Sequence, residues 1–154
     1  MKKTLKWIFG AVVVAFALLQ FTNPARTNPP VIHDFLAATM PPIEITGMFR
    51  ATCYDCHSHQ VRWPWYGRVA PVSWLVAGDV KTARRFLNFS DWPVDDPDRA
   101  ANRLENISEQ LGYNEMPPAN YKLMHPAARL TAAQREQLIQ WANQKAAQLK
   151  AKGK

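Results

Sequence analysis

The chain has only two cysteines, Cys53 and Cys56, and a histidine, His57, directly follows the second. This C-x-x-C-H arrangement is the attachment signature of c-type haem. Two intervening residues put both sulfurs on one helical turn, within reach of the two vinyl groups on one edge of a porphyrin. The next residue, His57, then points its imidazole at the iron. The spacing therefore predicts one covalently bound haem with His57 as its proximal ligand.

Three other chemistries use cysteines at this spacing, and each lacks something here. A thiol–disulfide oxidoreductase carries C-x-x-C at the N-terminus of a helix that follows a strand. In this chain the cysteines close a predicted helix, where the helix dipole raises a thiol pKa. A structural zinc site needs a second pair of ligands, which the remaining histidines, His33, His59 and His125, do not form. A bare disulfide would leave the adjacent histidine unexplained.

The second axial ligand of the iron has to come from the face opposite the proximal imidazole. Met116 stands in the loop sequence N-E-M-P-P, where Pro117 biases it towards extended backbone and Pro118 stiffens the next part of the loop. Met116 is therefore the predicted distal ligand. Met124 and His125, in the same loop, are the alternatives, together with no sixth ligand at all.

Three further candidates are poorly placed to reach the distal face. Met48 lies on the predicted helix that carries the cysteines, and therefore on the proximal side. Met40 precedes that helix and should lie ~15 Å or more from the haem. His59 follows the proximal histidine by two residues and cannot wrap around the ring.

The segment after the motif is rich in aromatic and basic residues. We expect its aromatic side chains to lie in the core and in the wall of the haem pocket rather than to form an electron relay: Trp63, Trp65, Tyr66 and Trp74. Trp63 is the candidate for contact with the haem. Arg62 and Arg68 could pair with haem propionates, since guanidinium groups suit carboxylates, or could simply be solvated. The proximal imidazole should donate its other N–H, and backbone carbonyls near Pro64 or Pro71 are candidate acceptors.

The N-terminus has the pattern of an export signal. Three lysines at positions 2, 3 and 6 precede fifteen uncharged residues, 7–21. These fifteen residues give ~23 Å of helix, short of a ~30 Å hydrocarbon core, although flanking residues could lengthen the span. The cleavage site is poorly defined, so we favour a retained anchor, with the N-terminus in the cytoplasm and the rest of the chain outside.

The rest of the chain predicts an all-α domain with a long connection to this segment. We assign residues 1–22 to the signal or anchor, 23–42 to an extended tether with five prolines, and 43–150 to the domain. Apolar residues with helical spacing predict about four helices joined by long structured loops: 45–56, 71–87, 97–111 and 131–149. Asp96 with Pro97, and Thr131 with Gln134, are expected to open the last two helices.

The charge distribution argues against nucleic-acid binding. The formal net charge is +7, but the excess lies in lysines at the two ends of the chain. Residues 7–144 carry twelve basic and twelve acidic side chains, so the body of the protein lacks the basic patch of a nucleic-acid binder.

Several sequence blocks, in order, resemble a bacterial family of haem-binding domain proteins. They are CYDCHSHQVRWPWYGRVAPVSWLVAGDV, LNFSDW and EMPPANYKLMHPAARLT, and the resemblance covers roughly residues 24–145. It implies a monohaem c-type domain related to small cytochromes c, attached through Cys53, Cys56 and His57, with Met116 as the matching distal methionine. Members of this family are typically exported by Gram-negative bacteria, so the resemblance implies a periplasmic location for this chain. A second M-P-P at residues 40–42 departs from the family pattern.

These observations favour single-electron transfer over catalysis. Iron with both a histidine and a methionine ligand is six-coordinate and has no open position for substrate. The sequence contains no second C-x-x-C-H for a dihaem peroxidase, and we expect no enzymatic activity. A haem sensor or small-ligand binder is the main alternative, and a thiol–disulfide oxidoreductase is the third. The redox partner is not identified by the sequence.

Overall fold

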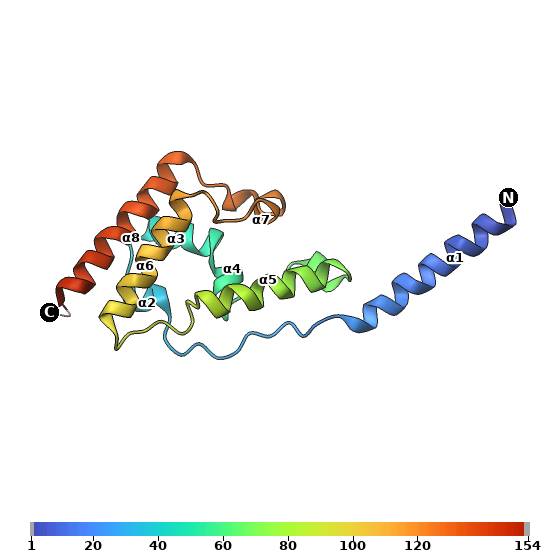
Figure 1. The fold of residues 1–154 in the computed structure, drawn as a ribbon, viewed down its shortest axis with the longest axis horizontal. Helices are drawn as coiled ribbons and strands as arrows, with labels where there is room; N and C mark the ends of the chain where they lie inside the picture. The colour runs from blue at the N-terminus through green and yellow to red at the C-terminus, as the bar shows by residue number, and fades with distance from the viewer. Residues whose placement is uncertain (1, 153–154) are drawn as a thin grey trace.

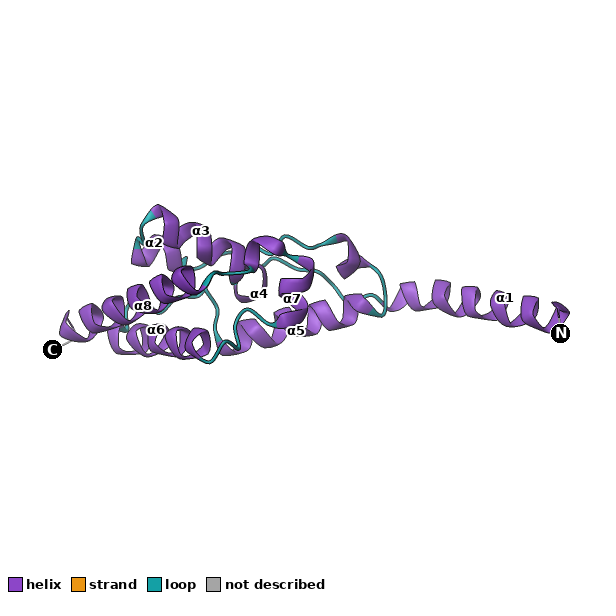
Figure 2. Cartoon of the chain, turned by 90° about the horizontal axis from the view of Figure 1, so that it is seen from above, coloured by secondary structure: helices purple, strands orange, loops and turns teal. Residues whose placement is uncertain are grey.

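The computed structural model describes residues 2–152, and its elements are all helical (Figures 1 and 2). In chain order they are α1 (Lys2–Leu19), η1 (Gln20–Thr22), α2 (Phe35–Thr39), α3 (Ile43–Thr52), α4 (Tyr54–His57), η2 (Trp65–Arg68), α5 (Val72–Phe86), α6 (Pro97–Gly112), α7 (Ala119–Met124), η3 (Pro126–Ala128) and α8 (Ala132–Lys152). Within the described residues the only β-type pairing is an isolated bridge between His33 and Asp91. The all-α prediction is confirmed.

Helices α6 and α8 lie side by side and form one wall of the domain (Figures 1 and 2). The buried face of α6 contains Leu104 and Leu111. The buried face of α8 contains Leu138, Ala142 and Ala146. The small alanines let the two backbones approach closely, which extends the contact along both helices.

Both helices begin where the sequence predicts. The Asp96 carboxylate accepts a hydrogen bond from the Arg99 amide at 2.9 Å, and Pro97 occupies the first turn of α6. At the start of α8 the Thr131 amide donates to Gln134 Oε1 at 2.9 Å, and the Gln134 amide donates to Thr131 Oγ1 at 3.2 Å. This is the predicted capping box.

A cluster of aromatic rings holds the remaining elements to this wall. Phe35 is fully buried and lies 4.7 Å from the Phe89 ring, 4.9 Å from Phe49 and 4.6 Å from Trp92, measured between ring centroids. Trp141 of α8 packs edge-on against Phe35 and Phe49. The core therefore joins four segments that are far apart in the chain.

The segment expected to be a tether is only partly one. Residues 23–34 are extended, but α2 follows, capped by Asp34 and burying Phe35 and Leu36 in the core. The amides of Ile32 and His33 both donate to the Ser90 carbonyl. The packed domain thus begins before residue 43, because the aromatic core needs Phe35.

The structure also interrupts the predicted helix over 45–56. Helix α3 ends at Thr52, Cys53 has φ −124° and ψ −38°, and α4 starts at Tyr54. The Thr52 hydroxyl donates to the Met48 carbonyl at 2.7 Å, a contact that favours bending. Tyr54 then stacks on Phe89 and donates to Asp34, which redirects the following turn. One continuous helix through both cysteines was therefore a wrong prediction.

Helix α1 extends away from the domain (Figure 1) and its residues are almost all exposed. The segment Lys2–Thr22 is long and apolar enough to cross a membrane, with a mean hydropathy of 1.8. This is compatible with the predicted signal or anchor. Its end is tied to the domain, because the Gln20 amide group exchanges hydrogen bonds with the backbone of Ala70 and Trp74 Nε1 donates to the Thr22 carbonyl.

Candidate functional site

His57 is held as a metal ligand would be held. Its Nδ1 lies 3.0 Å from the Leu87 carbonyl oxygen, just after α5. A carbonyl can only accept, so Nδ1 carries the proton and Nε2 keeps a free lone pair. Burial lowers the pKa of His57 and keeps the imidazole neutral. The acceptor is Leu87 and not a carbonyl near Pro64 or Pro71, the candidates that the sequence suggested, because α5 packs against α4.

Cys53 and Cys56 are both unpaired thiols in partly buried positions. Burial raises the pKa of Cys53 to about 11, and burial with the nearby Asp79 and Asp55 carboxylates raises the pKa of Cys56 to about 12. Both thiols are therefore protonated at neutral pH. A disulfide-exchange catalyst requires the opposite shift, a thiol pKa well below the usual value.

Asp55, between the two cysteines, connects the motif to two other segments. Its buried carboxylate accepts hydrogen bonds from the Arg62 amide at 3.1 Å and from Arg62 Nε and Nη2, both at 3.3 Å. On the other side it accepts a hydrogen bond from the Tyr121 hydroxyl of α7 at 3.0 Å. Burial and the Asp55 charge raise the pKa of Tyr121, so its hydroxyl stays a donor. Asp55 thus fixes α7 to α4.

The predicted propionate partners have different surroundings. Arg62 pairs with Asp55, which raises the Arg62 pKa, while three quarters of its side chain remains exposed. Arg68 lies on the surface in η2. Trp63 is half-buried, and its Nε1 is a buried donor for which the described residues supply no acceptor. Among these three candidates for haem contact, only Trp63 has a buried polar atom without a partner in the described residues.

Met116 lies in the connection between α6 and α7, and its backbone is fixed. Its amide donates to the Gln110 carbonyl at 3.3 Å, and its carbonyl accepts from Arg135 Nη1 at 3.1 Å. The side chain is half-buried and Pro117 is fully buried. Five residues later, Tyr121 of α7 is joined to the C-x-x-C-H motif by its hydrogen bond to Asp55.

The two alternative distal ligands are less available. His125 stacks on Tyr121 at 4.0 Å, its Nδ1 lies 3.2 Å from the Tyr121 carbonyl, and its Nε2 lies 3.4 Å from the Tyr66 hydroxyl. Both ring nitrogens of His125 are therefore engaged. Met124 is 48% exposed at the end of α7.

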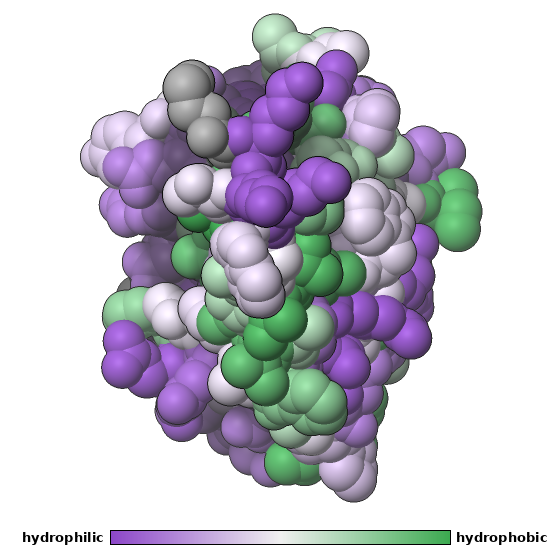
Figure 3. All heavy atoms as spheres, turned by 90° about the vertical axis from the view of Figure 1, so that its right-hand side faces the viewer, coloured by the Kyte–Doolittle hydropathy of each residue, from purple (hydrophilic) through white to green (hydrophobic). Residues whose placement is uncertain are grey.

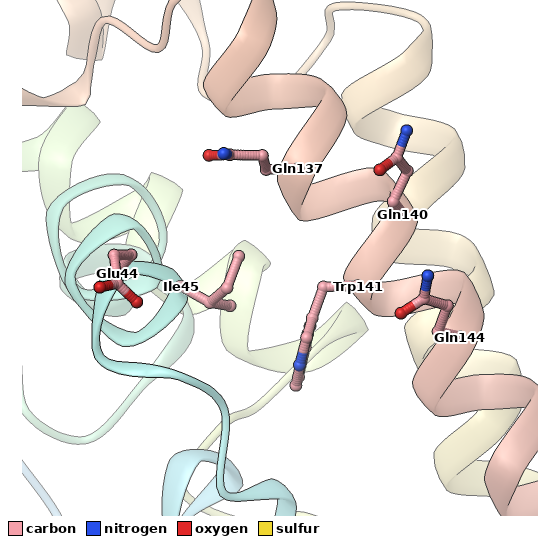
Figure 4. Close-up of a pocket in the computed structure, with 6 residues that line it drawn as sticks. All are labelled: Glu44, Ile45, Gln137, Gln140, Trp141 and Gln144. Atoms are coloured by element: carbon pink, nitrogen blue, oxygen red, sulfur yellow. The ribbon is translucent and has the colours of Figure 1, made fainter.

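Two open cavities lie apart from the cysteines. One, of about 320 Å³, separates α3 from α8 and is lined by Glu44, Ile45, Gln137, Gln140, Trp141 and Gln144 (Figure 4). Its amide-rich lining contains none of the predicted site residues. A groove of about 450 Å³ lies between residues 24–27 and α5, and Trp63, Trp74 and Arg84 line it. Trp63 is thus the one predicted site residue that lines either cavity.

A comparison with protein families decides the cofactor. Residues 14–144 match the model of the haem-binding domain family. The chain belongs to this family. It is therefore a haem-binding protein, and the match runs from within α1 to within α8. Searches of curated proteins and of solved structures each returned no match.

Sequence reasoning missed the residues that position the C-x-x-C-H motif. The Leu87 carbonyl, Asp55, Tyr121 and Arg84 all act through contacts between distant segments. Arg84 Nε donates to the Ser58 carbonyl at 2.9 Å and Nη1 to the Thr27 carbonyl at 3.1 Å, so it ties α5 to both the motif and the extended segment. Only Asp55 carried a signal, as a carboxylate inside the C-x-x-C motif.

Proposed function

We propose that this chain is a monohaem c-type protein that carries single electrons on the periplasmic side of the bacterial inner membrane. The observation that carries the proposal is the state of His57, with Nδ1 occupied by Leu87 and Nε2 free, directly after two unpaired cysteines. Haem supplies the one-electron chemistry, and the protein supplies ligands, orientation and protection from water.

Cys53 and Cys56 are the proposed attachment points. Each sulfur would bond to one carbon of a haem vinyl group and the thiol hydrogen would add to the other, so attachment would need no oxidant. The amides of Cys56 and His57 both donate to the Cys53 carbonyl, at 3.2 and 2.9 Å, so the three residues of the motif share one turn. The raised pKa values of both thiols argue against disulfide exchange, which needs a thiolate.

His57 is the proposed proximal ligand. Its hydrogen bond to Leu87 selects the tautomer, fixes the plane of the ring and increases the basicity of Nε2. The Phe89 amide also donates to the His57 carbonyl at 2.7 Å. The residues after α5 therefore hold both the side chain and the backbone of the ligand.

Met116 is the proposed distal ligand. Support comes from its fixed backbone, from its half-buried side chain and from the Tyr121–Asp55 hydrogen bond that joins its loop to α4. With His57 and Met116 both bound to the iron, the reduction potential would be higher than with other ligand sets. A filled coordination sphere suits electron transfer and leaves no open position for an enzymatic substrate. Arg62, Arg68 and Trp63 remain candidates for contacts to the haem edge.

The distal ligand can be tested by substitution. Met116→Ala should abolish the weak thioether-to-iron band of the oxidised protein, lower its potential and let carbon monoxide bind the reduced iron. Met124→Ala and Met40→Ala are the matched controls and should leave all three properties unchanged. If Met116→Ala retains the band, the assignment passes to Met124. If the wild-type protein already binds carbon monoxide readily, a haem sensor becomes the better description.

We further infer that α1 stays attached as a membrane anchor. Hydrogen bonds join the residues directly after α1 to the domain: Gln20 bonds to the backbone of Ala70, and Trp74 bonds to the Thr22 carbonyl. The mature protein should retain residues before Phe21 by mass and remain with membranes after a salt wash. A soluble protein that begins near Leu18 or Thr22 would show instead that the segment is a cleaved signal.

A further inference from the structure

Exposed apolar side chains gather where the domain meets the end of α1. They come from η1, η2 and the first turn of α5, and we name them the membrane-side surface: Phe21, Trp65, Val72, Trp74 and Leu75. Three of them are strongly exposed, at 88% for Phe21, 72% for Trp65 and 68% for Leu75. Figure 3 views the molecule from the α1 end, so that α1 lies nearest the viewer and its apolar residues contribute to the hydrophobic band at the centre of the view.

The position of this surface relative to a bilayer follows from the length of the anchor. Lys2–Thr22 contains 21 residues, and a helix of that length spans ~31 Å, which crosses a ~30 Å hydrocarbon core when the three flanking lysines extend their ammonium groups to the cytoplasmic headgroups. With the lysines at the cytoplasmic side, Thr22 lies at the opposite boundary. The Trp74 Nε1 bond to the Thr22 carbonyl, at 3.2 Å, therefore places Trp74 at the level of the headgroups.

The orientation of the domain is fixed by more than one contact. Gln20 Nε2 donates to the Ala70 carbonyl at 3.3 Å, and the Ala70 amide donates to Gln20 Oε1 at 3.0 Å. Together with the Trp74 bond, these contacts join the end of the anchor to both η2 and α5. Trp65 and Leu75 are exposed in the two elements, η2 and α5, that these contacts join to the end of the anchor.

We propose that the membrane-side surface docks the domain onto the phospholipid headgroup and acyl boundary of the bilayer that α1 crosses. Tryptophan is enriched at this boundary, because its ring is apolar and its N–H is polar. Leu75 and Phe21 supply the apolar area for shallow insertion. The exposed guanidinium of Arg68 in η2 suits the phosphate groups of phospholipid headgroups. The domain is therefore held in one orientation and does not swing on a flexible tether.

This inference rests on the proposed retention of α1 as an anchor, and the experiment separates the two. Leu75 is replaced by photoreactive benzoylphenylalanine in the full-length, haem-loaded chain, which is reconstituted in vesicles of phosphatidylethanolamine and phosphatidylglycerol. Phe86 is the matched control, since it lies on the same helix, is 74% exposed and is ~16 Å further along. After irradiation, mass spectrometry identifies the adducts.

Lipid adducts at Leu75, at least tenfold more abundant than at Phe86, are the expected result. Equal or absent lipid adducts at the two positions, in vesicles that retain the protein after a carbonate wash, would overturn the docking while leaving the anchor intact. Release of the protein by the carbonate wash would overturn the anchor, and the docking with it. In native membranes, a Leu75 adduct to a protein without any lipid adduct would assign the surface to a protein partner and overturn the proposal.

Discussion

The hydrogen bond between Tyr121 and Asp55 gives the sharpest test of how the proposed distal loop is held. Tyr121→Phe removes only the hydroxyl, which donates to the Asp55 carboxylate at 3.0 Å. A hydrogen bond to a charged group stabilises a protein by ~1.5–3 kcal/mol. Because Arg62 still donates to the carboxylate, Asp55 keeps partners and we expect a loss of ~2 kcal/mol. For a chain of 154 residues this lowers the melting temperature by ~4–8 °C.

The same substitution should loosen the loop that carries Met116. If the whole loss falls on the closed form of the loop, its open form becomes up to ~30-fold more populated, since ~1.4 kcal/mol is tenfold. Carbon monoxide affinity of the reduced protein should rise by up to that factor, and the thioether-to-iron band of the oxidised protein should weaken. Tyr113→Phe is the matched control, because Tyr113 is 72% exposed at the end of α6.

The assay combines urea unfolding, followed by far-ultraviolet circular dichroism, with carbon monoxide titration of the same samples. A Tyr121→Phe protein that matches Tyr113→Phe in both measurements would refute the role of this bond. A loss of stability without any change in carbon monoxide affinity would show that the bond stabilises the fold but does not hold the distal ligand.

Further predictions concern the core and the thiols. Phe35→Ala should lower the free energy of unfolding, measured in urea, by ~3–5 kcal/mol, because the ring of Phe35 is fully buried. Phe86→Ala is the control and should change it by less than ~0.5 kcal/mol, because Phe86 is exposed. Equal losses in the two variants would contradict the role of Phe35 in the core. In the haem-free chain, burial raises the pKa of Cys53 to about 11 and, with nearby carboxylates, that of Cys56 to about 12, from 9.0. The folded state therefore holds these protons more tightly, so its stability is complete below pH 9.0 and is lost as pH rises through about 11 and 12. The melting temperature of the haem-free chain should therefore fall over this pH range. The haem-loaded chain should not show this fall, because thioethers do not titrate. An equal fall in the haem-free and haem-loaded chains would contradict attachment at these sulfurs.

The helices were predictable where their signals are local. Asp96 with Pro97 marks the start of α6, and Thr131 with Gln134 marks the start of α8, because capping depends on residues within one turn. The apolar stripes then identify the faces that pack. These features follow from spacing alone, and the structure confirms them.

Other parts of the fold depend on partners that are distant in the sequence. Helix α2 is short and lies between prolines, and only the aromatic core explains why Phe35 is buried. The interruption at Cys53 reflects contacts of the next residue, Tyr54, with Asp34 and Phe89. Local periodicity predicted a continuous helix because it contains no information about these contacts.

In the candidate site, too, some features follow from local sequence and others depend on residues that are distant in the chain. The chemistry of Cys53, Cys56 and His57 was predicted from their types and spacing, and haem binding is confirmed by the family. The acceptor for His57 lies 30 residues away in the chain, and the donor to Asp55 lies 66 residues away. No spacing rule reaches such pairs, so the residues that orient the motif became visible only in the structure.

The most direct test of covalent haem attachment is the mass of the denatured protein after maturation with the c-type assembly machinery and extraction with acidified acetone. We predict that one haem remains covalently bound, with a reduced pyridine spectrum of the c type. Cys53→Ala and Cys56→Ala should each retain the haem through a single thioether and shift that spectrum, and the double substitution should release it. Complete loss of haem from the wild-type chain on extraction would contradict covalent attachment at Cys53 and Cys56.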